Sequence, residues 1–421
     1  MGIPAESATP PPDESAFAQR ERASRHRRRV RQGTVVLVVV VVATGGIGWA
    51  TNGFTRSLSS VLGAIGPRCP PTVALNGSGS TFIEPLMHTW VRAYSGAAST
   101  REQGCLVVLP TYNATGSEAG LGSLMNDGTE FVATEAPLTA VQEAGLPQPT
   151  LTLPLAVSGV AVAYNVPGVS GGLNLSGAVL AAIYLGAITL WNDSAIAALN
   201  PAVALPRATP IQVLHQSAGS STNYVFSGFL AASNSTWASA VGQGSSVAWP
   251  VGSSAGGDPG TAALLRTTPG AIGFLGLGTA LNDSLSCAKI ENPALRFVAP
   301  SASSVFAAAT SYTETLPLGN ESWQNVSLLD LPGVASYPIA TFTYAIVYAD
   351  LGIAYHGSIK LNAAQWLAAF LYWMSVAGQS YGTSLGYAPF SQTVTLGNQQ
   401  IVELLRYDGI PALGDVDYDG D

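Results

Sequence analysis

The stretch TVALNGSGSTF, residues 72–82, places a short apolar run before a turn of small residues, and the amphipathic segment IEPLMHTWVRAY, residues 83–94, follows it directly. A strand, a Gly/Ser turn and a helix in this order are typical of an α/β fold. The turn also suits an anion, because glycines let the backbone approach a ligand and Ser80 and Thr81 lie beside the free N–H groups of a helix N-terminus. A turn that only caps the helix has the same composition, and this interpretation stays open.

Two later turns have the same character, NATGSEAG at residues 113–120 and HQSAGSSTNYVF at residues 215–226. Each lies between an apolar run and a predicted helix. In open α/β sheets a ligand binds beyond the carboxyl ends of the strands, so hydroxyl-rich turns from several strands can surround one small anion. The three turns together predict an anion-binding site.

The order of the elements predicts two α/β lobes joined by two crossings. A chain of 421 residues is long for a single core. The apolar run at residues 153–167 is long enough to leave one lobe and enter a second, and the run at residues 336–349 is a strand that can return to the first. The predicted limits are residues 72–158 and 336–410 for the first lobe, residues 159–335 for the second, and residues 411–421 for an acidic C-terminal tail.

The chain resembles the phosphate-binding proteins of the ABC phosphate-uptake system over most of residues 72–410. NGSGSTFIEPL is similar to the family's opening GAGATFPAPL, and YNATGSEAGLGSLMNDGTEFVATEAPLT to its Y-x-x-x-GSGAG…DFGASDAPLT. Further counterparts follow in the same order: LPLAVSGVAVAYNVPGV, VLAAIYLGAITLWNDSAIAALNP, TPGAIGFL and LGYAPF. The resemblance implies an α/β, two-lobed periplasmic-binding-protein fold of the Venus-flytrap kind.

In that family, backbone N–H groups, Ser/Thr hydroxyls, one Arg and an acceptor Asp hold the oxyanion between the lobes. Position by position, the resemblance implies that nine residues bind the ligand here. They are Ser80, Thr81, Phe82, Ser117, Glu135, Gln216, Ser220, Ser221 and Thr222. Glu135 stands where the family has its acceptor Asp, and Gln216 stands where it has the Arg.

Two further departures accompany these: Ala218 replaces an Asp just before the third turn, and Glu118 replaces a small residue after Ser117. A charge-assisted hydrogen bond contributes roughly 1.5–3 kcal/mol against about 1 kcal/mol for a neutral one, so loss of the Arg is expected to weaken phosphate binding by about tenfold or more. If the lost Arg and the lost Asp formed a pair, no charge is left uncompensated. Glu118 repels a dianion if it points inward, and not if it faces water at the rim.

These departures predict an oxyanion site tuned away from a dianion and toward a monoanion favoured at low pH. The resemblance implies a solute-binding protein that captures phosphate or a related oxyanion for an ABC-transporter permease, with no enzymatic activity and no cofactor. The sequence has no GxSxG elbow and no His, Cys and carboxylate set with metal-site spacing, so no metal is expected, and an enzyme such as a phosphatase that uses the anion cradle has little support. A surface interaction protein that kept the fold and lost the ligand stays open as the alternative, which Gln216, Ala218 and Glu118 favour.

The charge balance excludes nucleic acid as a partner. The chain has 17 Lys and Arg against 25 Asp and Glu, and seven of the basic residues fall within residues 1–31. Residues 32–421 therefore carry a more negative net charge than the −8 of the whole chain. Binding to a phosphate backbone needs clustered basic side chains.

The N-terminal segment predicts a membrane anchor. Residues 32–55 are 24 residues without a charge, and at 1.5 Å per residue they span about 36 Å, enough for a hydrocarbon core of ~30 Å. The basic segment 1–31 before them and the lone Arg56 after them predict a cytoplasmic N-terminus and an extracellular binding domain, in a single-pass protein of the cell membrane. Residues 56–71 would form a spacer. A cleaved signal peptide stays open as the alternative.

The three cysteines allow one disulfide outside the cell. Cys69 with Cys105 is the preferred pair, because each immediately precedes a strand-like run, and Cys287 is then left over. Three buried free thiols are the alternative.

Overall fold

The computed structural model describes residues 72–101, 108–169 and 171–413, all within the unit Cys69–Asp421. The predicted cytoplasmic tail, the predicted transmembrane helix at residues 32–55, the spacer, and both Cys69 and Cys105 lie outside these residues, as does most of the acidic tail. Within them, no helix combines the length and the hydropathy that a membrane span requires. Cys287 is a free thiol.

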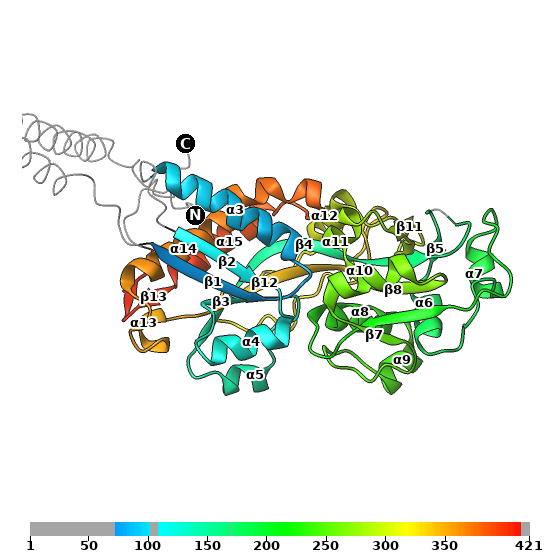
Figure 1. Cartoon of the computed structure of the whole chain (residues 1–421), viewed down its shortest axis with the longest axis horizontal. Helices are drawn as coiled ribbons and strands as arrows, with labels where there is room; N and C mark the ends of the chain where they lie inside the picture. The colour runs from blue at the N-terminus through cyan, green and yellow to red at the C-terminus, as the bar shows by residue number, and fades with distance from the viewer. Residues whose placement is uncertain (1–71, 102–107, 170, 414–421) are drawn as a thin grey trace, which may run out of the picture. The chain divides into compact units, whose positions relative to one another are not determined.

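The first lobe is built on five strands in the order β2-β1-β3-β12-β4 (Figure 1). β1 pairs in parallel with β2 and β3, whereas β12 is antiparallel to β3 and β4. The strands are β1 Val73–Gly79, β2 Val108–Asn113, β3 Phe131–Thr134, β4 Thr150–Asn165 and β12 Ala340–Tyr348. Because β1, β2 and β3 are parallel, their carboxyl ends meet at one edge of the sheet, and the first two predicted turns begin there.

Helices cover both faces of this part of the sheet (Figure 1): α14 and α15 pack against β4, and α4 packs against β1 and β3. The helices of this lobe are α3 Glu84–Arg101, α4 Ser117–Met125, α5 Ala140–Gly145, α13 Leu351–Ala354, α14 Leu361–Ser375 and α15 Gln392–Glu403, with 3-10 helices η1 Ala377–Tyr381 and η2 Thr383–Leu385. A hairpin of β13 Arg406–Tyr407 and β14 Ile410–Pro411 ends the described chain.

The second lobe continues the same sheet in the order β4-β8-β6-β7, with β9 also paired to β4. Its strands are β6 Gln212–Gln216, β7 Ser253–Ala255, β8 Ala271–Gly276 and β9 Ser286–Cys287, and a small separate sheet holds β5 Asn174–Leu175, β10 Lys289–Glu291 and β11 Phe297–Val298. Its helices are α6 Gly177–Tyr184, α7 Ser194–Leu199, α8 Ser221–Ser233, α9 Ser235–Ala240, α10 Gly257–Thr267, α11 Leu277–Asn282 and α12 Ala302–Thr310. The α/β fold with two lobes that the sequence predicts is confirmed.

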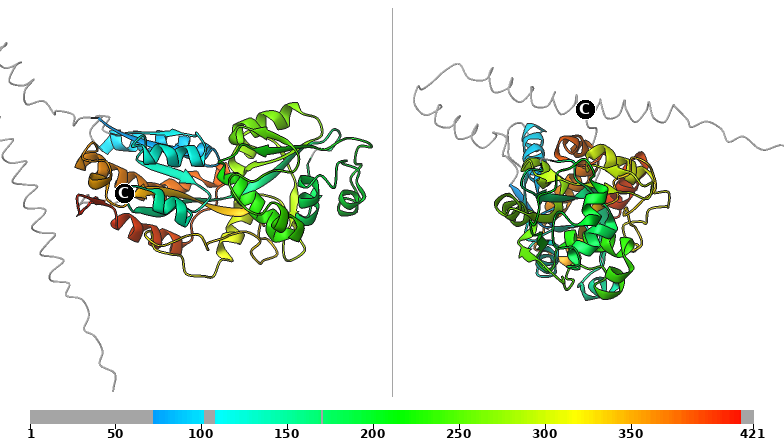
Figure 2. Two further views of the ribbon diagram at one scale, coloured as in Figure 1. Left: turned by 90° about the horizontal axis from the view of Figure 1, so that it is seen from below. Right: turned by 90° about the vertical axis from the view of Figure 1, so that its right-hand side faces the viewer.

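The strand β4 belongs to both lobes. Its residues 150–159 pair with β12, and its residues 160–165 pair with β8. Its side chains are buried on both faces, which is why its sequence is a continuous apolar run and not an alternating one. In Figure 1 and in the left view of Figure 2, the early and late parts of the described chain gather at one end of β4 and the middle part, in green, at the other. The lobe limits at residues 158/159 and 335/336 stay predictions.

The crossing in β4 is tightly packed around Gly159. A Cβ atom at this position would lie 3.0 Å from the ring of Tyr337 and 3.1 Å from a methyl carbon of Val305. The buried Tyr337 donates its hydroxyl hydrogen to the carbonyl oxygen of Val160 over 2.8 Å, and the Val160 N–H donates to the carbonyl oxygen of Ile339 over 2.8 Å. The two chain segments that connect the lobes are therefore bonded to each other at the crossing.

This packing predicts that Gly159→Val lowers the free energy of unfolding by about 1–3 kcal/mol, because added methyl groups overpack a filled site. Urea unfolding of the purified chain measures it. Gly122→Ala is the control: a Cβ at Gly122 meets nothing within 4 Å, and alanine replaces glycine in a helix with a gain of roughly 0.5–1 kcal/mol. A Gly159→Val protein as stable as the original would contradict the packing described at the crossing.

Candidate anion-binding cleft

The first predicted turn leaves β1 at Gly79, where only glycine fits. Its φ is 126°, and a Cβ atom would lie 2.2 Å from the carbonyl oxygen of Ala133. The backbone is held there because the Ser80 N–H donates to that oxygen over 2.9 Å, and the Gly116 N–H of the second turn donates to the Gly79 oxygen over 2.8 Å. The first two turns are therefore fixed against each other and against β3.

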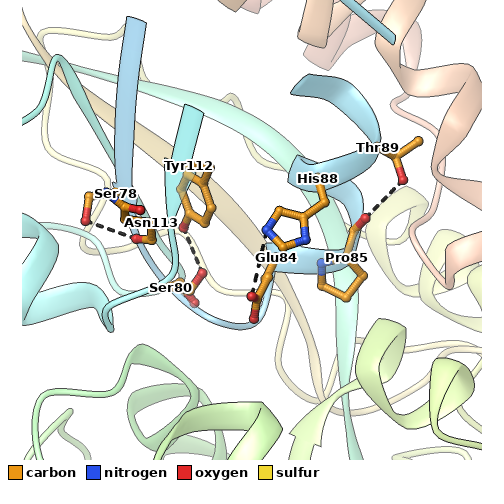
Figure 3. A network of polar contacts seen from close by, with 8 residues as sticks. All are labelled: Ser78, Ser80, Glu84, Pro85, His88, Thr89, Tyr112 and Asn113. Atoms are coloured by element: carbon orange, nitrogen blue, oxygen red, sulfur yellow. Dashed lines mark hydrogen bonds and ion pairs between the residues drawn. The ribbon is translucent and has the colours of Figure 1, made fainter. Parts of the chain in front are cut away.

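Side chains tie the same two turns together, as Figure 3 shows. The Tyr112 hydroxyl donates to the carbonyl oxygen of Ser80 over 2.7 Å, and the Ser78 hydroxyl donates to the carbonyl oxygen of Asn113 over 3.1 Å. The predicted site residue Phe82 is fully buried, and its carbonyl oxygen accepts a hydrogen bond from the Tyr387 hydroxyl over 2.7 Å. Its part is thus to anchor the turn in the core.

The third turn lies between β6 and α8 in the second lobe. Gly219 has φ 83°, and Ser220 caps α8 by accepting the Thr222 N–H over 3.2 Å. The buried amide of Asn223 donates to the carbonyl oxygens of Gln216 and Ser217 over 3.1 and 2.9 Å. Beneath the turn, Phe226 of α8 stacks on Phe274 of β8 with 4.1 Å between ring centres, so the core fixes the helix that presents the turn.

All three turns line one pocket of about 560 Å³. Of the nine predicted site residues, five line it: Ser80, Thr81, Ser117, Gln216 and Ser220. The other four, Phe82, Glu135, Ser221 and Thr222, are buried residues that do not line it. None of the lining residues is a Lys or an Arg, and in the described parts of the chain no group of three His, Cys, Asp or Glu is placed to hold a metal ion.

A fourth turn, which the sequence analysis did not identify, completes the pocket. Gly256 and Gly257 line it at the start of α10, and a Cβ atom at Gly257 would lie 2.8 Å from the Thr81 hydroxyl oxygen. The Asp258 N–H donates to that oxygen over 3.0 Å. The segment SSAGGDPG, residues 253–260, has the same strand, glycine and helix order as the other turns, and this was the signal that could have revealed it.

Glu135 follows β3 and lies among the predicted anion-binding hydroxyls. It is 1% exposed. Its Oε2 accepts hydrogen bonds from Ser80 over 2.5 Å and from Ser221 of the second lobe, and its Oε1 accepts one from Thr343 over 2.9 Å. Burial raises the pKa of this carboxyl to about 7; the three hydroxyls oppose the rise, and the nearby Asp258 adds to it.

Gln216, at the position of the family's Arg, binds the buried carboxyl of Asp258. Asp258 belongs to the fourth turn and, like that turn, was not predicted from the sequence. The Nε2 of Gln216 donates to Asp258 Oδ1 over 2.5 Å, and the Oε1 of Gln216 accepts from the Ser220 hydroxyl over 2.6 Å. The other carboxyl oxygen of Asp258 accepts the Gly276 N–H over 2.7 Å. Burial raises the pKa of Asp258 to about 6.

The side chain of Glu118 could point into the cleft or face water at its rim, and in the structure it is exposed at the rim. Its N–H donates to the carbonyl oxygen of Gly219 over 3.1 Å, and its carboxylate accepts a hydrogen bond from the Ser245 hydroxyl. Both partners belong to the second lobe, whereas Glu118 lies in the first turn of α4, in the first lobe. With Ser117 and Ser221, whose hydroxyl oxygens lie 2.6 Å apart, these contacts join the two lobes directly.

Comparisons with known proteins agree with this geometry. Residues 66–376 match a family model described as a PBP superfamily domain. The phosphate-binding protein PstS of Xylella fastidiosa is 32% identical over 326 residues, which cover 76% of this chain and 82% of that protein. The phosphate-binding protein PstS 2 of Mycobacterium tuberculosis is 34% identical over 316 residues, covering 71% and 80%.

Among solved structures, the phosphate-binding protein of Stenotrophomonas maltophilia has the same fold. It matches with a TM-score of 0.55 at 15% identity and covers 79% of this chain and 94% of that one. Since the sequence relatives are matched over more than two thirds of the chain, at 30% identity or above, the chain belongs to the PstS family of phosphate-binding proteins within the PBP superfamily.

Proposed function

We propose that this protein binds phosphate or a related oxyanion between its two lobes and delivers it to an ABC-transporter permease, as a solute-binding protein that does no covalent chemistry. The observation that carries the proposal is the pocket of about 560 Å³, which turns from both lobes line with hydroxyl and backbone donors. The relatives in Xylella fastidiosa and Mycobacterium tuberculosis, both named phosphate-binding proteins, support phosphate as the ligand.

The donors suit a small anion of low charge. Gly116 and Gly256, the N-cap residues of α4 and α10, have no side chain and line the pocket, so the partly positive N-termini of both helices face it. No basic side chain lines the pocket to balance a second negative charge. A monoanion such as dihydrogen phosphate therefore fits this arrangement better than a dianion.

The location of the protein is a separate proposal. The 24 uncharged residues 32–55, with the basic segment before them, support a single membrane anchor with the N-terminus in the cytoplasm and the binding domain outside. Attached in this way, the receptor would remain near the permease that it serves.

One observation favours the alternative, a surface interaction protein without a ligand. Ser80 and Ser221, which are expected to bind the anion, donate their hydrogens to Glu135, and direct hydrogen bonds already join the lobes. A cleft that closes on its own side chains needs no ligand to stay closed. Measurement of phosphate binding separates the two functions.

Titration calorimetry of the purified full chain with phosphate at pH 5 is expected to show saturable heat with one site per chain. Thr81→Val should weaken this binding by about five- to tenfold, because it removes one hydroxyl donor from the pocket. Thr310→Val, on the exposed surface of α12, is the control and should bind as the original chain does. Absence of heat with phosphate at pH 5 and at pH 7 would reject phosphate as the ligand and favour the interaction protein.

Gln216→Arg is expected to strengthen phosphate binding by roughly tenfold, because a charged donor replaces a neutral one in the pocket. Asp258, which lies 2.5 Å from the amide of Gln216, provides a counter-charge that keeps the new cation acceptable when buried. Gln212→Arg at the exposed start of the same strand is the matched control, with the same charge change away from the pocket. If both variants changed the affinity equally, Gln216 would have no direct part in binding.

A further inference from the structure

The position of Glu135 raises the question of how an anion can enter a cleft that already contains a buried carboxyl group. Glu135 lies in the first lobe, yet one of its three hydroxyl partners, Ser221, comes from the second. The charged groups that act on it are acidic: Asp258 is the one that raises its pKa, and no Lys, Arg or His of the described chain forms an ion pair with it. The carboxyl is therefore held by hydroxyl groups alone.

The hydroxyl hydrogens are already in use while Glu135 is charged. Each hydroxyl has a single hydrogen to donate. Ser80 and Ser221 donate theirs to Glu135 Oε2. Since Ser221 is then the acceptor in its 2.6 Å contact with Ser117, the hydrogen of Ser117 points into the same group. Three of the predicted anion donors are thus directed at the carboxylate, either directly or through one another.

A proton on Glu135 changes both the charge and the direction of these hydrogen bonds. A neutral carboxyl has one O–H donor and needs fewer hydrogen-bond donors around it, so the hydrogens of the two pocket-lining residues Ser80 and Ser117 can turn toward an anion, that of Ser117 because Ser221 no longer has to donate to Glu135. The like charge beside the anion is removed at the same time. Because burial already raises the pKa of Glu135 to about 7, the proton binds without a large free-energy cost near neutral pH.

A second pocket also borders Glu135. Glu135 does not line the pocket of the three turns, but it lines a second pocket of about 380 Å³ together with Tyr224, Phe342 and Tyr344. This second pocket lies along β12 and α8, where the anion donors are absent. Because this pocket borders Glu135 and the anion pocket does not, it is the place from which we expect the proton to reach the carboxyl.

We infer that the cleft takes up its anion together with one proton, and that Glu135 is the residue that receives the proton. The inference rests on the proposed binding of phosphate between the lobes. If each anion binds together with one proton, the affinity for the anion falls as the pH rises above neutrality. Above the pKa of free Glu135, this contribution amounts to about tenfold per pH unit.

Calorimetric titration of the full chain with phosphate at pH 8, in several buffers of different ionisation enthalpy, counts the protons taken up per phosphate bound. Phosphate itself titrates near this pH, but its contribution is the same for every variant and cancels in a comparison. The original chain is expected to take up about one proton more than Glu135→Gln, whose amide cannot be charged. Glu135→Gln should also bind phosphate roughly tenfold more tightly than the original chain at pH 8.

Glu130→Gln is the matched control. Glu130 stands at the other end of β3, burial also raises its pKa, and its carboxylate accepts the Asn76 N–H away from the pocket. This variant should take up the same number of protons as the original chain. Infrared difference spectra of the original chain give a measurement that does not depend on how the variants fold: phosphate at pH 8 should remove a carboxylate band and add a band of a protonated carboxyl.

The outcomes separate this inference from the proposed function. Equal proton uptake by the original chain and Glu135→Gln, with phosphate bound to both, would overturn the inference and leave the function in place. An infrared spectrum in which phosphate binding leaves the carboxylate band unchanged would overturn it as well. Absence of phosphate binding to either protein at pH 5 and pH 8 would overturn the proposed function itself, and the inference with it.

Discussion

The hydrogen bonds to the carboxyl group of Glu135 are the interaction on which the cleft depends. A buried carboxylate is unfavourable unless donors or a cation compensate it, and here the compensation comes from Ser80 and Thr343 in one lobe and Ser221 in the other. The contact therefore joins the lobes, sets the direction of the neighbouring hydroxyls and makes the cleft sensitive to protons. The packing at Gly159 and the turns at Gly79 and Gly219 serve to present these groups to one another.

A second buried carboxyl, that of Asp258, is bonded to Gln216, the residue that stands where the family has an arginine. Gln216 bridges Asp258 and Ser220 through its amide, donating to one and accepting from the other. A neutral side chain thus satisfies both partners, and the turn keeps its shape although the cation of the family is gone. The consequence is electrostatic, because Glu118, Glu135 and Asp258 surround the donors of the pocket and no basic side chain lines it.

Much of this could be predicted from the sequence, because strand, glycine turn and helix patterns are local. The three turns, the two crossings and the departures at Glu118, Glu135 and Gln216 are all visible in short stretches of residues. Three features were not. Asp258 is 42 positions from Gln216, and the strand, glycine and helix order of its turn does not indicate which residue its carboxyl contacts. Thr343 looks like one more residue of a buried strand, and the contact of Ser245 with Glu118 depends on how the lobes meet. These are pairings between distant parts of the chain, which local patterns do not specify.

Turns from both lobes form one anion site beside Glu135. A crystal structure of the protein grown with phosphate at pH 5 tests it most directly. We expect one phosphate between the lobes, within hydrogen-bond distance of Ser80, Thr81 and Ser117 and of the turn at Ser220 and Ser221, with fewer hydroxyls directed at Glu135. A cleft that stays closed on Glu135, with Ser80 and Ser221 still bonded to it and no phosphate despite an excess in the crystal, would show that these turns do not form an anion site.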